Sequence, residues 1–222
     1  MKIALLGKGK TGSKVIDVSP YPLTIFDSQK SPTHHELVNC DVILSFLPGE
    51  AFKQHIPLLL ETKKPVVTGS TGFEWPENFH EELKQKGLSW VWATNFSLGV
   101  FILKKMIKDL SELSELYSSS EFHLHEIHHT KKLDSPSGTA LSMKEWLNRS
   151  VHITAERTGD VIGYHELTLS TGAEKIKLSH EALDRKLFAE GAIKACELIM
   201  KYQPIGLTSF QDLLEKSLLK KA

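Results

Sequence analysis

The stretch "ALLGKGKTGSK" (residues 4–14) decides the fold of the first half of the chain. An apolar run here meets three glycines, Gly7, Gly9 and Gly12, in the spacing G-x-G-x-x-G. In a strand–turn–helix unit such glycines allow a tight turn, close approach of the backbone to a pyrophosphate, and close packing of helix on strand. The N–H groups at the helix start then face the phosphates. We expect a dinucleotide loop whose contacts come from Gly7, Lys8, Gly9, Lys10, Thr11 and Gly12.

A second apolar run, "LTIFD", ends at Asp27, 20 residues after Gly7. An acid at this position binds the ribose hydroxyls of the adenosine half of a dinucleotide. It would repel a 2′-phosphate, which favours NADH over NADPH, although Lys10 and Lys30 could offset that repulsion. Only 14 residues separate Gly12 from Asp27, so the first helix is expected to be short. The alternative is a glycine-rich turn that binds nothing.

Strand-like and helix-like segments alternate through the first hundred residues. "DVILSFL", "PVVTG" and "LSWVWAT" are near-continuous apolar runs, as in strands covered on both faces. Between them lie the helix-like segments "GEAFKQHIPLLLET" and "WPENFHEELKQKG", the second expected to begin near Pro76. This alternation predicts an α/β fold with a Rossmann-type, doubly wound parallel sheet.

The pattern changes after Asn95. "SLGVFILKKMIKDL" reads as a helix, and "EFHLHEIHH", "GYHELTLS" and "EKIKLSH" alternate like half-buried strands, the last two flanking "TGA" as a hairpin. We expect a smaller α+β substrate domain with a mixed or antiparallel sheet. Residues 1–97, completed by 203–222, would bind the dinucleotide. Residues 98–202, including the long helix in "DRKLFAEGAIKACELIMKY", would bind substrate and mediate oligomerisation.

Composition excludes several classes of protein. Lysine plus arginine and aspartate plus glutamate number 27 each, which argues against nucleic acid or an anionic membrane as the main partner. Cys40 and Cys196 have neither metal-type nor secreted-domain spacing. The chain has no signal-peptide pattern and no apolar run of about 20 residues. We therefore expect a cytoplasmic protein.

The stretch "EIHHTKKLDSPSGTA" (residues 126–140) concentrates the chemistry of the second half. Pro136 and Gly138 predict a turn, and "SGTALSMKEWL" then begins a helix. Ser137, Gly138 and Thr139 would offer N–H and hydroxyl donors to a carboxylate at the positive helix end. His128 can exchange a proton near pH 7, and a nearby lysine supplies positive charge for an anion.

Two other interpretations of this stretch are open. A metal site is disfavoured because adjacent histidines on an extended chain point in opposite directions and no carboxylate or cysteine completes a ligand set. We therefore expect no metal. The stretch could also be a purely structural cap and turn. The histidines at alternating strand positions, His123, His125 and His165, are expected to be packed or solvated.

These residues resemble the 4-hydroxy-tetrahydrodipicolinate reductase (dihydrodipicolinate reductase) family. The family signature reads approximately E-x-H-H-x-x-K-x-D-A-P-S-G-T-A, and only Ser135, in place of alanine, departs from it. "VVTGSTGF" (66–73), "NFSLGV" (95–100) and residues 157–195 also agree with the family. The resemblance implies NAD(P)H-dependent reduction of a dicarboxylate, 4-hydroxy-tetrahydrodipicolinate, to tetrahydrodipicolinate in lysine and diaminopimelate biosynthesis. It also implies a homotetramer.

The resemblance assigns roles residue by residue. His128 would be the catalytic histidine and Lys132 the catalytic lysine. The substrate carboxylates would be held by His129, Ser137, Gly138 and Thr139. Besides the glycine loop and Asp27, the cofactor would contact Phe46, Gly69, Ser70, Thr71, Asn95, Phe96 and Ser97. Two departures bear on cofactor choice: Lys10-Thr11-Gly12 replaces the usual Arg-Met-Gly, and Ser45-Phe46-Leu47 replaces Asp-Phe-Thr. His180 and Arg185 also fall on family landmarks.

Two rival functions share the first-half motif. Another Rossmann-fold dehydrogenase, acting on an open-chain amino or imino acid, should lack the His-His, Lys, Ser-Gly-Thr run. A non-catalytic dinucleotide sensor would have no need of a protonatable histidine beside a lysine and an anion-binding turn. The run "EIHHTKKLDSPSGTA" therefore favours the reductase.

Overall fold

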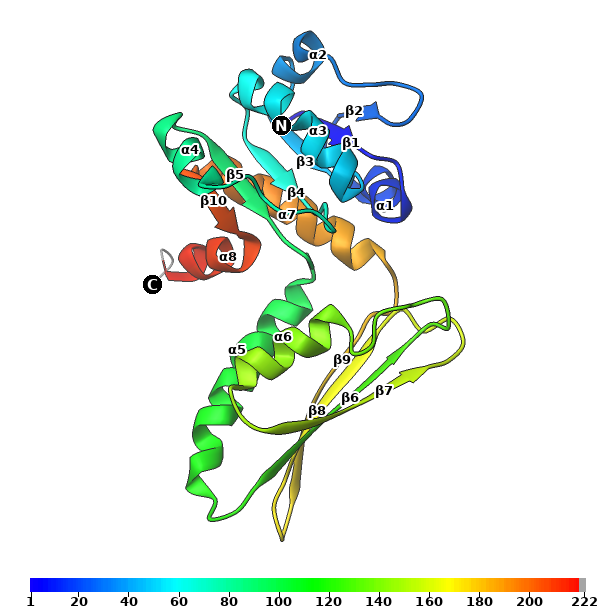
Figure 1. Cartoon of the computed structure of the whole chain (residues 1–222), viewed down its shortest axis with the longest axis vertical. Helices are drawn as coiled ribbons and strands as arrows, with labels where there is room; N and C mark the ends of the chain where they lie inside the picture. Colours follow the sequence, from blue (N-terminus) through cyan, green and yellow to red (C-terminus); the bar gives the residue numbers. More distant parts are fainter. Residues whose placement is uncertain (220–222) are drawn as a thin grey trace. The chain divides into compact units, whose positions relative to one another are not determined.

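A computed structural model describes residues 1–219. The chain forms two compact units (Figure 1). The first contains Met1–Phe96 and the chain from Arg185 onward, and the second contains Ser97–Asp184. Among the described residues, no helix has the length and apolar character needed to cross a membrane.

The first unit is built on a six-stranded sheet. Its strands, in spatial order, are β10 (Gly206–Ser209), β5 (Ser89–Trp92), β4 (Val66–Thr68), β3 (Val42–Ser45), β1 (Ile3–Leu6) and β2 (Leu23–Phe26). Every neighbouring pair is parallel. The side chains of β1, β3 and β4 are fully buried, which explains their near-continuous apolar sequences.

Helices cover both faces of this sheet. They are α1 (Lys10–Val18), α2 (His34–Val38), α3 (Gly49–Thr62), α4 (Phe79–Gln85), α7 (Lys186–Tyr202) and α8 (Phe210–Leu219). One apolar cluster joins the strands to α2, α3 and α4 through Leu37, Phe52 and Phe79. Helix α7 contacts β3, β4 and β5 and also α1 and α8. The predicted doubly wound parallel sheet is confirmed.

Helix α7 lies in a different unit from the one expected. The sequence placed residues 185–202 with the substrate domain, whereas α7 belongs to the first unit. Its buried face is made of small residues, including Ala189, Gly191 and Ala192. A Cβ added to Gly191 would lie 1.8 Å from the carbonyl oxygen of Phe96. Glycine therefore lets the helix backbone contact the loop after β5. Of the expected C-terminal segment 203–222, the last three residues lie outside the described part of the chain.

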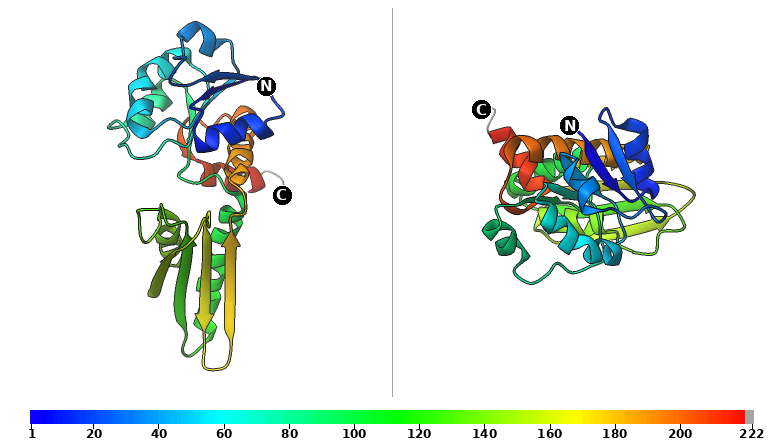
Figure 2. Two further views of the ribbon diagram at one scale, coloured as in Figure 1. Left: turned by 90° about the vertical axis from the view of Figure 1, so that its right-hand side faces the viewer. Right: turned by 90° about the horizontal axis from the view of Figure 1, so that it is seen from above.

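The second unit is a four-stranded mixed sheet with helices on one face (Figure 2). The strand order is β7 (Val151–Arg157), β6 (Glu121–His128), β8 (Tyr164–Ser170) and β9 (Lys175–Glu181). β6 pairs with β7 in parallel, and the other two pairs are antiparallel. Helices α5 (Leu98–Leu113) and α6 (Gly138–Leu147) share a core with the inner face, followed along the chain by the short helix η1 (Ser114–Leu116). The predicted smaller α+β domain is confirmed.

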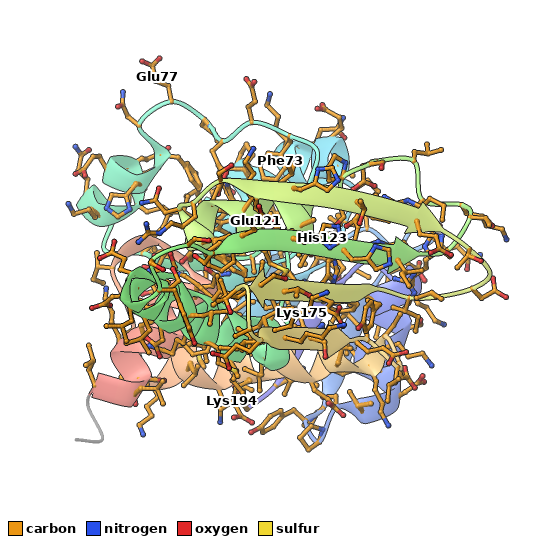
Figure 3. The ribbon with its side chains drawn as sticks, turned by 90° about the horizontal axis from the view of Figure 1, so that it is seen from below. Phe73, Glu77, Glu121, His123, Lys175 and Lys194 are labelled. Atoms are coloured by element: carbon orange, nitrogen blue, oxygen red, sulfur yellow. The ribbon has the colours of Figure 1, made fainter. Side chains whose placement is uncertain are left out.

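Polar side chains occupy the sheet face that the core does not use. His123 on β6 and Lys175 on β9 are labelled on the strands in Figure 3, and the rings of His123 and His152 stack at 5.5 Å. Thr154 hydrogen-bonds to His123 and His125 from the neighbouring strand. Both His123 and His125 are half-buried, which fits the expectation that they are packed or solvated.

Four elements of the described chain are absent from the sequence-based prediction: α2, η1, β7 and β10. Helix α2 has five residues and β10 has four, too few to show a periodicity. β7 does carry a strand signal, since apolar Val151, Ile153 and Ala155 alternate with polar residues, and Val151 and Ile153 pack against the core. None of its seven residues is fully buried, and the prediction overlooked this short alternation. Helix α4 begins at Phe79 rather than near Pro76.

Candidate active site

The first unit contains a pocket at the carboxyl ends of its strands. Between β1 and β3 the order of strand connection reverses, and ligands of open α/β sheets bind at such a reversal. The pocket has a volume of about 940 Å³, which is within the range of small-molecule and cofactor sites. Its walls contain nine residues predicted to bind the dinucleotide: Gly7, Lys8, Gly9, Lys10, Thr11, Asp27, Phe46, Gly69 and Thr71.

The three loop glycines have different surroundings. Gly7 has φ +97°, and a Cβ there would lie 2.9 Å from the backbone of Phe46. A Cβ on Gly12 would lie 1.9 Å from the carbonyl oxygen of Gly7, so Gly12 serves helix–strand packing and does not line the pocket. Gly9 has open space in front of it, and no side chain caps the start of α1. This arrangement fits a pyrophosphate at the helix N-terminus.

Asp27 lies at the pocket wall immediately after β2. Its Oδ1 accepts hydrogen bonds from the N–H groups of Gln29 and Lys30, at 2.9 and 3.2 Å, which fix the carboxylate in a turn. The ammonium of Lys30 instead pairs with Glu36 at 2.8 Å. Lys30 is thus already paired, which weakens the idea that it offsets the charge of Asp27.

The other predicted cofactor residues lie off the pocket wall. Ser70 is buried against Ser45, with 3.3 Å between the two hydroxyls. Phe96 is buried and packs edge-on against Phe46, while Gly69 lies between the two rings. Asn95 follows β5, and Ser97 belongs to the second unit. Nine further lining residues were not predicted, because they belong to no motif: Leu6, Phe26, Ser28, Ser31, Pro32, Leu47, Pro48, Ala51 and His55.

A buried polar cluster lies at one end of the sheet in the second unit. Glu126 and His128 share the inner face of β6, and strand pairing places His165 opposite Glu126 and Arg157 beside His128. Glu126 is fully buried and His128 and His165 nearly so. Oε2 of Glu126 lies 3.7 Å from Nδ1 of His128 and 3.6 Å from Nε2 of His165. Arg157 donates to Oε1 at 2.9 Å.

The protein environment keeps Glu126 ionised and His128 neutral. Burial would raise the pKa of Glu126, but the neighbouring His165 and the hydrogen bonds from Ser137 and Arg157 outweigh burial and hold the pKa well below its usual range. Burial and then the neighbouring His165 lower the pKa of His128 from 6.5 to about 4, against the opposing effect of Glu126. The expectation of a histidine that titrates near pH 7 is therefore wrong for this structure.

The predicted carboxylate-binding turn lies beside this cluster. Ser137 is the N-cap of α6 and accepts a hydrogen bond from the N–H of Ala140, as the sequence predicted for a helix beginning here. Gly138 and Thr139 form its first turn. Lys132 donates to Asp134 at 2.8 Å. This bond, with a backbone hydrogen bond from Gly138, lowers the pKa of Asp134. One carboxylate thus contacts two groups that were predicted to bind an anion.

The remaining predicted residues frame the same turn. The N–H of His129 donates to Val161 and its carbonyl accepts from Lys132, so its backbone fixes the loop after β6. Gly163 leaves room for the catalytic candidate, because a Cβ there would lie 3.2 Å from Nε2 of His128. His180 lies opposite His165 on β9 and is 3.3 Å from Ser97, the N-cap of α5.

The stated reason against a metal is wrong. Glu126 supplies a carboxylate, and one ligand atom each from Glu126, His128 and His165 lie within 4.8 Å of one another. The guanidinium of Arg157, however, already neutralises this carboxylate, and both Arg157 and Lys132 lower the pKa of His128. The positive charges of Arg157 and Lys132, which disfavour a proton on His128, would repel a metal cation at the same place. The donor set therefore fits a metal poorly.

Comparison with known proteins identifies the family. A model of the dihydrodipicolinate reductase N-terminus matches residues 18–96, and a model of its C-terminus matches residues 99–214. The chain belongs to the dihydrodipicolinate reductase family. The resemblance inferred from the signature is thereby confirmed. The N-terminal match begins after the glycine loop, where this chain departs from the usual Arg-Met-Gly.

Individual relatives cover nearly the whole chain. The 4-hydroxy-tetrahydrodipicolinate reductase of Bdellovibrio bacteriovorus is 33% identical over 96% of both chains. That of Thermosipho africanus is 30% identical over 99% of this chain and 100% of its own. Among solved structures, the dipicolinate-bound dihydrodipicolinate reductase of Paenisporosarcina sp. TG-14 has a TM-score of 0.73 at 19% identity, covering 94% and 97% of the two chains. Aspartate dehydrogenase from Thermotoga maritima shares the fold with a TM-score of 0.54 at 14% identity, covering 92% and 98%.

The main omissions from the predicted site are Glu126, Arg157 and His165. Glu126 was quoted within the signature without a role, and His165 was expected to be merely packed or solvated. Their proximity depends on pairing among three strands, which spacing along one segment does not reveal. The available signal was Glu126 itself, a charged residue at an inward position of an alternating strand.

Proposed function

We propose that this chain reduces 4-hydroxy-tetrahydrodipicolinate to tetrahydrodipicolinate with a nicotinamide dinucleotide, in lysine and diaminopimelate biosynthesis. The observation that carries the proposal is similarity to reductases of that name over almost the full length of both chains. The intact signature from Glu126 to Ala140 supports it. Loss of the hydroxyl as water and addition of a hydride and a proton balance the conversion.

The first unit is proposed to bind the cofactor, which supplies the hydride when bound. Gly7, Gly9 and the start of α1 would hold the pyrophosphate, and Asp27 would accept hydrogen bonds from ribose hydroxyls. The fixed carboxylate of Asp27 would disfavour a 2′-phosphate, and Lys30 is paired with Glu36. These contacts support NADH as the preferred cofactor.

The second unit is proposed to bind the dicarboxylate and manage the proton. Ser137, Gly138 and Thr139 at the start of α6, with His129, would hold the carboxylates, and Lys132 would provide positive charge. His128 is neutral without substrate, but two carboxylates nearby would raise its pKa, because opposite charges favour the protonated form. His128 could then donate the proton to the ring, with Lys132 stabilising the developing charge.

Substitution of the two proposed catalytic residues tests this function. Removing a general acid lowers the rate by roughly 10²–10⁴-fold, so we expect His128→Gln and Lys132→Ala each to lower kcat by that order. The measurement is oxidation of NADH, followed by absorbance, with freshly made cyclic substrate. Dinucleotide affinity should be unchanged in both variants. Full activity in both would refute the proposed site, and an inactive wild-type enzyme would refute the proposed reaction.

We further propose that the chain assembles as a tetramer through the sheets of its second unit. The support is the family resemblance, together with the polar face of β6–β9 that carries His123 and Lys175 (Figure 3). Sedimentation equilibrium of the wild-type protein measures the assembly directly. A monomer at micromolar concentration would contradict this part of the proposal.

A further inference from the structure

We propose that Glu126 is a positioning residue of the substrate site, whose one buried carboxylate sets both the first turn of α6 and the rings of His128 and His165. The inference rests on the proposed function for its meaning in catalysis. Its structural part depends only on contacts within the second unit.

The first carboxylate oxygen fixes the backbone of the anion-binding turn. Oε1 accepts a hydrogen bond from the N–H of Ser137 at 3.0 Å and another from Arg157 at 2.9 Å. Arg157 also donates to the carbonyl of Asp134. A single buried oxygen on β6 therefore links β7 to the loop that precedes α6. Hydrogen bonds to an ionised acceptor are stronger than neutral ones, so this link is stiff.

The second oxygen faces the two imidazoles. Oε2 of Glu126 lies 3.7 Å from His128 and 3.6 Å from His165, and it has no hydrogen-bond partner among residues 1–219. The same Nε2 of His165 is 3.2 Å from the hydroxyl of Ser137. That hydroxyl caps α6. Glu126 thus reaches Ser137 twice, directly through the backbone and indirectly through His165.

A simpler interpretation is a structural ion pair between Glu126 and Arg157. Such a pair needs only Oε1 and gives no reason for two histidines to be placed at the other oxygen. The charges facing His128 come from four elements: Glu126 on its own strand, Arg157 on β7, His165 on β8, and Lys132 in the loop after β6. Of these, only Glu126 favours protonation of His128. A positioning role therefore predicts changes at His128 that an ion pair alone does not.

The decisive variant is Glu126→Gln, which keeps the side-chain shape and removes the charge. We expect dipicolinate binding to weaken and kcat to fall, each by about 10- to 100-fold. This is the range found when a residue that does not touch the ligand, but orients the side chains that do, is replaced. NADH affinity should be unchanged. In ¹³C-detected titration of the histidines, the pKa of His128 should fall in Glu126→Gln and rise in His165→Asn. Glu126→Asp, which keeps the charge, should restore part of the loss.

Glu166→Gln is the matched control. Glu166 is next to His165 on β8, points to the opposite face, and pairs with Lys177 at 2.9 Å. The same carboxylate-to-amide change there should leave dipicolinate binding, kcat and the titration of His128 within twofold of wild type.

A second variant is needed in case Glu126→Gln does not fold, because that change leaves Arg157 without its buried partner. Glu126→Gln combined with Arg157→Met removes both charges and should show the same losses. The inference is overturned if folded Glu126→Gln binds dipicolinate and turns over within twofold of wild type with the pKa of His128 unshifted. It is also overturned if the folded double variant binds dipicolinate and turns over within twofold of wild type; its His128 titration is not used, because Arg157 and Glu126 shift that pKa in opposite directions. If the wild-type enzyme does not oxidise NADH with the cyclic substrate, the proposed reaction fails. The dipicolinate and titration measurements then still test Glu126 independently.

Discussion

At the scale of single residues, His128 is proposed to change its protonation state when substrate binds. Burial and the neighbouring His165 lower its pKa to about 4, so the ring is neutral at pH 7 in this structure. A dianionic substrate would reverse that balance, because two negative charges near the ring favour its protonated form. His128 would then take up the proton when substrate binds, so the proton would be present only when the substrate ring can accept it.

Gly163→Ala tests how closely the His128 ring must be held. The added methyl group would lie 3.2 Å from Nε2 of His128, tighter than an ordinary contact, so the ring must move by a few tenths of an ångström. A misplacement of 1 Å can lower the rate by about 10²-fold, so we expect kcat/KM to fall roughly 3- to 10-fold. Gly172→Ala at the tip of the β8–β9 hairpin, where a Cβ meets no atom within 4 Å, is the control. Equal activity in both variants would contradict the prediction.

Asp27→Ser tests the choice between the two cofactors. Serine can still accept the turn's hydrogen bonds but loses the charge that is proposed to bind ribose hydroxyls. A hydrogen bond to a charged group contributes about 1.5–3 kcal/mol, so the ratio of NADPH to NADH affinity should rise roughly 10- to 100-fold. Equilibrium titration of both cofactors gives that ratio. Lys30→Ala should leave it unchanged, since Lys30 pairs with Glu36. An unaltered ratio in Asp27→Ser would remove Asp27 from its proposed role.

The residues that the sequence could predict are those with local signals. The glycine spacing predicted the pocket wall from Gly7 to Thr11, and the Ser-Gly-Thr turn predicted the N-cap Ser137. Glu126, Arg157 and His165 come together through strand pairing across up to 39 positions of sequence, as Glu126 pairs with His165. Such contacts have no local periodicity. The low pKa of His128 follows from those same neighbours and was therefore missed as well.

At the scale of elements, both helices of the second unit begin in the same way. Ser97 caps α5 and Ser137 caps α6, each through its hydroxyl to the N–H three residues on. Each hydroxyl is also within 3.3 Å of a histidine from the sheet: His180 for Ser97 and His165 for Ser137. Those two histidines are cross-strand partners on β8 and β9. The cross-strand pair of His165 and His180 therefore positions the N-termini of both helices.

Gly191→Ala tests the packing that holds α7 in the first unit. The new methyl group would lie 1.8 Å from the carbonyl oxygen of Phe96, and the obstructing atom is backbone. Forcing extra volume into a packed site costs about 1–3 kcal/mol, so the unfolding temperature should fall by several degrees. Differential scanning calorimetry measures the shift. Glu190→Ala, at an exposed position of the same helix, should change it little. A stable Gly191→Ala variant would show that the helix can move away without loss.

The same helix explains why the domain boundary was hard to predict. Its sequence shows an amphipathic helix but does not say which sheet its apolar face covers. The small residues on that face, Ala189, Gly191 and Ala192, fit close approach to a parallel sheet and to the loop at Phe96. By contrast, the apolar runs of β1, β3 and β4 specify burial on both faces by themselves. Local composition identified the strands, whereas the partner of α7 depends on tertiary packing.

At the scale of the whole molecule, the described carboxyl and imidazole groups whose pKa is influenced most by burial lie in one unit. Glu126, His123, His128 and His180 all belong to the second unit, and all have lowered pKa values. In the first unit, the described groups with lowered pKa values are Glu36 and Glu197, for which hydrogen bonds from lysine are the leading cause. The two units should therefore respond differently to acid.

The second unit is predicted to lose stability first as the pH falls. The pKa of His128 is about 4 when folded and 6.5 ordinarily, so between those values the unfolded chain binds a proton that the folded chain does not. Its contribution, at most about 3 kcal/mol, is complete above pH 6.5 and declines toward pH 4. His123 and His180 act in the same direction because burial lowers both pKa values. The loss from Glu126 begins only below its usual value of 4.5.

Fluorine NMR of 5-fluorotryptophan-labelled protein can measure this difference. Trp146 is the one tryptophan of residues 97–184, while Trp75, Trp90 and Trp92 report on the first unit. Between pH 7.5 and pH 5, the urea midpoint seen at Trp146 should fall more than the midpoints seen at the other three. His128→Gln, which cannot take up the proton, should reduce that difference. Equal shifts at all four tryptophans would show that the buried cluster does not control acid stability, because its groups lie in one unit only.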